Sequence, residues 1–105
     1  MNRLSVADDN IIQKILVIST AHIKEETSDW LKEEIEDGQT GLVAYEKSDY
    51  GYLILIQDDI AENGVSGVPE DLLRLYRFAH SVGVEWIMLD CDAPEICEVP
   101  VYEWR

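Results

Sequence analysis

The spacing of hydrophobic and polar positions changes along the chain, and these changes predict its first elements. Residues 15–19 form a continuous apolar run of strand length, which is typical of a strand covered on both faces. Over residues 23–37 the apolar positions recur at helical spacing, and they are Ile23, Thr27, Trp30, Leu31 and Ile35. This pattern predicts a helix, with Gly38 ending it in a left-handed turn.

The middle of the chain predicts a β-hairpin followed by a loop. Residues 42–47 and 52–57 are strand-like runs, and the four residues between them are rich in turn formers. The stretch from 58 to 68 contains an Asn-Gly pair and a further glycine, which favour a loop.

The last third predicts a helix and two strands. Pro69 suits the first turn of a helix, and Gly83 provides its end. Residues 84–89 predict a fourth main strand, and residues 99–104 predict a short edge strand.

The order β-α-β-β-α-β predicts an α+β fold of the ferredoxin-like, or split βαβ, type. Its first and third strands would be central, and both helices would cover one face of the sheet. The other face would expose apolar side chains such as those of residues 53–55, and the N-terminal extension, the C-terminal tail or a second subunit would have to cover it. We expect an N-terminal extension over residues 1–14 and a single domain over 15–105.

Charge is the outlying property of the composition. The chain has 22 acidic residues against 8 Lys and Arg, so its formal net charge is −14. Such a field repels nucleic acid and anionic membranes and attracts basic partners. The chain has no apolar run of about 20 residues and no secretory signal pattern, so we expect a cytoplasmic protein with Cys91 and Cys97 as reduced thiols.

The acids concentrate on the first predicted helix, where residues 25–37 hold seven acids and a single lysine. Like charges at helical spacing destabilise a helix, so their repetition leaves two interpretations open, a surface that serves solubility alone and a surface directed at a partner. Along the axis they resemble a row of phosphates. The residues expected to contact a basic partner are Glu25, Glu26, Asp29, Glu33, Glu34, Glu36, Asp37, Asp58 and Asp59.

Two further features contain residue types that can act in catalysis or metal binding. Ser19, Thr20 and His22 stand where a strand meets a helix, and capping and packing explain them better than nucleophilic chemistry. His80, near the end of the second predicted helix, is likewise expected to be structural.

A separate group of acids follows the third and fourth strands, and its members are Asp58, Asp59, Asp90 and Asp92. In a ferredoxin-like sheet these strands would be parallel, and the four carboxylates would gather at one edge. They would then be either solvated turn residues or the ligands of a divalent ion in a small metal-dependent enzyme.

Several segments together, "STAHI", "SDWL", "DYGYL", "VPEDL", "VEWIMLD" and "PVYEW", resemble a family of small uncharacterised proteins common in bacterial, plasmid and phage genomes. The resemblance covers residues 15–104. It implies a mobile-element setting, in which small acidic proteins often block nucleic-acid-binding surfaces of host defence proteins.

These observations lead to one main hypothesis and two alternatives. The chain is expected to be a non-enzymatic interaction protein, of the anti-CRISPR or anti-restriction type, that acts as a DNA mimic on a basic protein surface. We expect no cofactor, no catalytic residue and no direct contact with nucleic acid or membrane. The alternatives are the metal-dependent enzyme and a dimeric ferredoxin-like module that binds a ligand or protein through its sheet.

Overall fold

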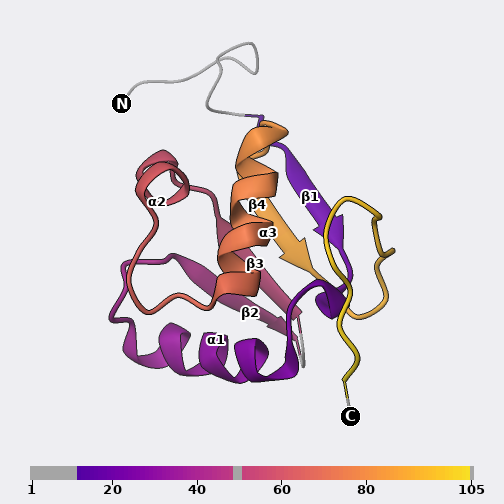
Figure 1. The fold of residues 1–105 in the computed structure, drawn as a ribbon, viewed down its shortest axis with the longest axis horizontal. Coiled ribbons are helices and arrows are strands. Elements are labelled where there is room, and N and C mark those ends of the chain that lie inside the picture. The colour runs from indigo at the N-terminus through magenta and orange to yellow at the C-terminus, as the bar shows by residue number, and fades with distance from the viewer. Residues whose placement is uncertain (1–11, 49–50, 105) are drawn as a thin grey trace, which may run out of the picture.

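The structure is a computed structural model that describes residues 12–48 and 51–104 (Figure 1). Of the expected N-terminal extension, residues 1–11 lie outside the described part. The elements are the strands β1 (Ile15–Ile18), β2 (Ala44–Ser48), β3 (Gly51–Leu55) and β4 (Trp86–Leu89), the helices α1 (Glu25–Asp37), α2 (Asp58–Asn63) and α3 (Glu70–Ser81), and the short 3₁₀ helix η1 (Thr20–His22).

The four strands form one mixed sheet in the order β1-β4-β3-β2. Strand β1 pairs with β4 in parallel, whereas β4 with β3 and β3 with β2 are antiparallel. The α+β class is confirmed, but the prediction that the first strand is central is wrong, because β4 takes that place. Strand β1 lies at an edge, and its Ile15 and Val17 are 44% and 45% exposed.

All three α-helices pack on one face of this sheet, as Figure 1 shows for α3 lying across β3 and β4. The register places one set of strand residues on the same face. Its members Ile18, Tyr52, Ile54, Ile87 and Leu89 are fully buried. They form one core cluster with helix residues that include Leu31 of α1, Ile60 of α2, and Leu72 and Leu75 of α3.

Helix α2 replaces the first part of the loop predicted for residues 58–68. Its Ile60 and Ala61 are buried in the core, whereas a solvated loop would leave these side chains exposed. Asn-Gly at positions 63 and 64 ends this helix, since Gly64 has φ +70° and donates its N–H to the Ile60 carbonyl. The prediction was therefore wrong because the same dipeptide serves both turns and helix ends.

The two longer helices end in different ways. Gly83 follows α3 with φ +82°, which is the left-handed conformation expected there. Gly38 follows α1 with φ −32°, so the predicted left-handed turn is wrong at this end. A buried carboxylate, described below, binds the backbone beyond α1 instead.

The Ser-Thr-Ala-His segment forms the junction between β1 and α1, as predicted. The Ser19 hydroxyl accepts a hydrogen bond from the Ala21 N–H at 3.0 Å and caps η1. His22 is 1% exposed, and both of its ring nitrogens are bonded to the C-terminal segment. Nε2 accepts from the Ile96 N–H at 2.9 Å, so the proton lies on Nδ1, which donates to the Pro100 carbonyl at 2.8 Å.

The C-terminal segment crosses this junction without forming the predicted edge strand at residues 99–104. Pro100 has no N–H for a strand ladder, and the segment binds the junction instead. Tyr102 donates its N–H to the Ala21 carbonyl at 2.8 Å, and the Trp104 indole donates to the Ile23 carbonyl at 2.9 Å. Val99 is buried in the core, so the tail closes the helix side of the molecule beside β1 (Figure 1).

We expect His22→Ala to lower the free energy of unfolding by about 2–4 kcal/mol, because it leaves a cavity and two unpaired backbone groups. Urea denaturation followed by far-UV circular dichroism measures this. The matched control is His80→Ala, which removes one part-exposed imidazole and should change stability by less than about 0.5 kcal/mol. Equal urea midpoints for the two variants would contradict the role given to His22.

Candidate functional site

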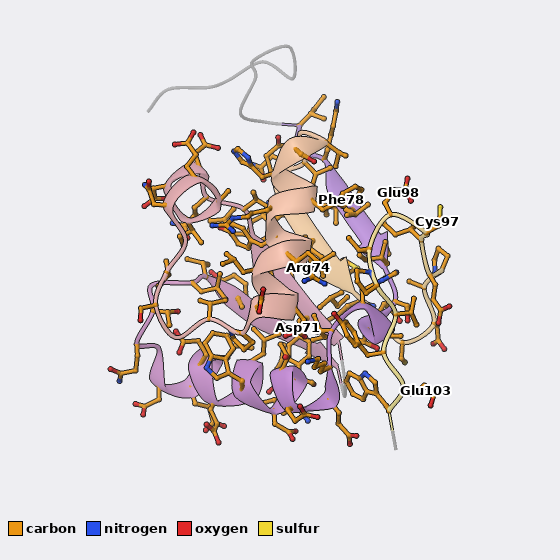
Figure 2. The ribbon with its side chains drawn as sticks, in the orientation of Figure 1. Asp71, Arg74, Phe78, Cys97, Glu98 and Glu103 are labelled. Carbon is orange, nitrogen blue, oxygen red and sulfur yellow. The ribbon has the colours of Figure 1, made fainter. Side chains whose placement is uncertain are left out.

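Helix α1 carries most of the acids that the sequence singles out, and its start is fixed by a residue of α3. The Asp71 carboxylate accepts hydrogen bonds from the Lys24 N–H and the Thr27 hydroxyl, each at 2.8 Å. Figure 2 shows Asp71 on the first turn of α3, next to α1. A carboxylate at this position binds free N–H groups and complements the positive end of the helix dipole. The rotation of α1 about its axis is therefore fixed by these hydrogen bonds to α3.

Five exposed acids of α1 form a single stripe. At about 100° of rotation per residue, they fall within an arc of about 100°, opposite the buried Ser28 and Leu31. Figure 2 shows oxygen-tipped side chains along this outer side of the helix. We call this set the acidic stripe, and its members are Glu26, Asp29, Glu33, Glu36 and Asp37.

Helix α1 carries seven acids and one lysine, Lys32, which itself has an interaction partner. From Glu26 to Asp37 the helix rises about 16 Å, so the stripe presents one carboxylate about every 4 Å. That density is close to the one phosphate per 3.4 Å of a DNA strand.

Two of the seven predicted acids of α1 differ from the stripe. Glu25 is half-buried and already has an interaction partner. Glu34 is 8% exposed, and its carboxylate accepts the N–H groups of Gln39 and Thr40 at 3.1 and 2.9 Å. Glu34 is therefore unavailable to a partner, and its role is to bind the backbone after α1.

The environment of Glu34 shifts its pKa in a direction that can be tested. Burial acts to raise the pKa, but the hydrogen bonds from the Thr40 hydroxyl and the Thr40 and Gln39 N–H groups outweigh it. The pKa of Glu34 therefore lies below its ordinary value. No feature of the sequence separates this glutamate from its exposed neighbours except its helical position, which is on the side of Leu31.

Asp58 and Asp59 do not extend the acidic stripe. Both are exposed at the start of α2, and Asp58 binds His80 near the end of α3 at 2.9 Å. Asp71, which binds the start of α1, is nine residues earlier on α3, or about 14 Å along its axis. The predicted partner surface is thus divided between two regions of the molecule.

The four aspartates of the metal hypothesis are also separated. Strands β3 and β4 are antiparallel neighbours, so Asp58 and Asp59 after β3 lie at the opposite end of the sheet from Asp90 and Asp92 after β4. The prediction that they gather at one edge is therefore wrong, because it assumed that these strands run in parallel.

A smaller group at the end of β4 has possible ligand atoms within 4.8 Å of one another, on Asp90, Cys91 and Asp92. Asp90 is already engaged there, since one oxygen binds the Lys47 ammonium at 2.6 Å and the other accepts the Asp92 N–H at 2.9 Å. The hydrogen bond from Lys47 lowers the pKa of Asp90, and the same contact raises the pKa of Lys47. The arrangement is that of an ion pair closing the end of the sheet.

As predicted, the second face of the sheet is apolar, and it is most exposed on the edge strands β1 and β2. The exposed residues there include Ile15, Val17 and Tyr45, at 44%, 45% and 55%. The uninterrupted apolar run of β1 suggested two covered faces, and a strand at an edge gives the same run.

Comparison with known proteins places the chain in a family without assigning an activity. The model of the "Family of unknown function (DUF5983) C-terminal domain" matches residues 15–104, and the chain belongs to this family. Neither a curated protein nor a solved structure matches the chain. Among residues 12–48 and 51–104, no helix is long and apolar enough to cross a membrane.

We expect Glu34→Gln to lower the free energy of unfolding at pH 7 by about 1–2 kcal/mol, because the amide keeps the size but loses the charge of the acceptor. The lowered pKa means that this stabilisation is complete above the unfolded-state pKa, near 4.3, and is lost as the pH falls through the folded-state value. Urea titrations between pH 7 and pH 2.5 measure both effects.

The neighbouring exposed Glu33→Gln serves as the control and should change the free energy of unfolding by less than about 0.5 kcal/mol at every pH. If the difference between Glu34→Gln and the unmodified protein stayed constant down to the acid limit, the assigned role of the charge would be wrong.

Proposed function

We propose that this protein is a non-enzymatic interaction protein whose acidic stripe occupies a basic, nucleic-acid-binding surface of another protein. The observation that carries the proposal is the alignment of five exposed acids on one side of α1. A solubilising surface requires no such alignment. Binding to a partner with a row of Lys or Arg residues along a groove does require the acids to be aligned.

The electrostatics support a mimic of nucleic acid rather than a binder of it. With a formal net charge of −14, the chain is repelled by phosphate backbones and attracted to the surfaces that bind them. The spacing of the stripe allows several basic side chains of a groove to find carboxylates in place of phosphates. Long-range attraction of this kind acts mainly on the association rate and weakens with salt.

We base our proposal for the finer identity of the partner on the resemblance of the sequence to proteins of bacterial, plasmid and phage genomes. In that setting we propose a host defence protein that binds DNA or RNA, which makes the chain an inhibitor of the anti-CRISPR or anti-restriction type. Asp71 supports this role indirectly, because it fixes the rotation of α1 and hence the direction of the stripe. A rigid row of charges loses less conformational entropy on binding than a mobile one.

The test uses the triple variant Glu26→Lys, Asp29→Lys and Glu33→Lys. Each reversal replaces a negative charge with a positive one and changes the net charge by +2, so the formal net charge changes from −14 to −8. We expect the unmodified chain to retain nucleic-acid-binding proteins from a bacterial lysate, identified by mass spectrometry, and to compete with DNA or RNA for them. The variant should lose at least about 100-fold in affinity, and binding of the unmodified chain should fall steeply with salt.

The matched control reverses Glu62, Glu95 and Glu98, which are exposed acids outside α1 and change the net charge by the same amount. Figure 2 shows Glu98 on the C-terminal segment, away from α1. Retained binding by this control would assign the effect to the stripe. Equal losses in both variants would show that total charge matters and would rule out the stripe as a specific surface.

A further inference from the structure

The second face of the sheet is apolar, and no described element covers it. By the strand register, the residues that point to this side come from all four strands. We call it the open face, and its members are Ile15, Val17, Tyr45, Leu53, Leu55, Trp86 and Met88. None of the seven belongs to the core cluster or to the residues packed against it. Tyr45 and Trp86 contact each other there, with ring centroids 6.5 Å apart.

The open face is also the neutral region of an acidic molecule. At one end of it the Lys47 ammonium and the Asp90 carboxylate neutralise each other at 2.6 Å. At the other end the Trp86 indole donates to the Gln13 side chain at 2.7 Å. The acidic stripe belongs to α1, which packs on the other side of the sheet.

We propose that a second copy of this chain packs on the open face and forms a two-fold symmetric dimer. Two such faces are identical, apolar and free of uncompensated charge, which is what a self-complementary interface requires. Sheets that pack face to face lie about 10 Å apart with their strands roughly aligned. The helices of both copies then lie outside this pair of sheets, and their acidic stripes stay in solvent.

Charge repulsion does not prevent this arrangement, although both copies are strongly acidic. With one helix layer on the outside of each sheet, the two α1 helices are separated by roughly 30 Å, several times the Debye length of about 8 Å in physiological salt. A contact through α1 would instead bring the two stripes together. The open face is therefore the side on which two copies can meet.

The size of the open face fits a dimer of modest affinity. Tyr45 is 55% exposed and presents on the order of 100 Å², and the seven side chains together present roughly 500 Å² per copy. Two copies then bury roughly 1,000 Å², which is at the lower limit of specific interfaces. We expect a dissociation constant in the micromolar range.

The C-terminal tail, which the sequence offered as a cover, lies elsewhere. Val99 enters the core on the helix side, and Tyr102 and Trp104 bind the η1 junction. The tail therefore leaves Ile15 and Val17 exposed. A basic partner of the kind proposed above would be held by the acidic stripe and has no charge to meet on the open face.

Sedimentation equilibrium of the full chain over concentrations from about 1 to 500 µM tests the dimer. The chain offers a matched pair of valines, since Val17 on the open face is 45% exposed and Val101 on the tail is 47% exposed. Val17→Lys should weaken self-association by at least about tenfold, and Val101→Lys should change it by less than about twofold. The added lysine lowers the net negative charge, so repulsion cannot explain the loss.

Salt separates this contact from docking through the stripe. Self-association through an apolar face should strengthen or stay constant as salt screens the charge of the two copies, whereas stripe docking should weaken. Circular dichroism tests whether each variant is folded. If Val17→Lys is unfolded, Tyr45→Lys provides a second change on the open face.

Three results would overturn the proposal. One is a monomer at every concentration, and another is equal self-association of the Val17 and Val101 variants. The third is a dimer that forms only after residues 1–11 are deleted, which would identify the N-terminal segment as the cover of the open face.

Discussion

Strand β4 lies between β1 and β3, parallel to the first and antiparallel to the second, and most of the molecule follows from this placement. It brings residues that are far apart in the chain into one core, since Leu89 pairs with both Ile18 and Tyr52. It also directs the chain after β4 toward the end of β1. There the backbone of the tail meets the junction residue His22, whose two ring nitrogens bind it.

The same placement gives the molecule two unlike sides. The helix side holds the core, the closing tail and the acidic stripe of α1. The other side is a four-stranded apolar surface whose ends are closed by the Lys47–Asp90 ion pair and the Trp86–Gln13 hydrogen bond. Charge and apolar surface are thus segregated, and one chain can offer two surfaces that follow different physical rules. A dimer through the open face would present two stripes on one particle, which favours a partner with two basic grooves or a symmetric partner.

Local features were predictable from the sequence because they depend on residues close together in the chain. The span of α1, the end of α3 at Gly83, the β2–β3 hairpin and the capping role of Ser19 all follow from spacing or turn chemistry. Five of the seven acids of α1 are exposed as expected. These positions required only the periodicity of a helix.

Features that depend on neighbours distant in the chain were not predictable. Strand order is one of them, because the apolar runs of β1 and β4 look alike although one is an edge strand and the other is central. The separation of Asp58 from Asp90 follows from that order. Glu34 is another, since its role depends on where the chain turns after Gly38, and its neighbours Glu33 and Glu36 have the same chemistry.

The three tryptophans lie in three different surroundings, one in each region with a distinct role. Trp30 lines a shallow hollow with Glu33 and Asp37 beside the stripe, Trp86 lies on the open face, and Trp104 is bonded to the η1 junction. Each indole is therefore an intrinsic fluorescent probe of its own region. In variants that keep a single indole, changes in emission wavelength and in quenching by iodide would show separately whether the charged helix, the sheet surface or the tail responds to a given binding event.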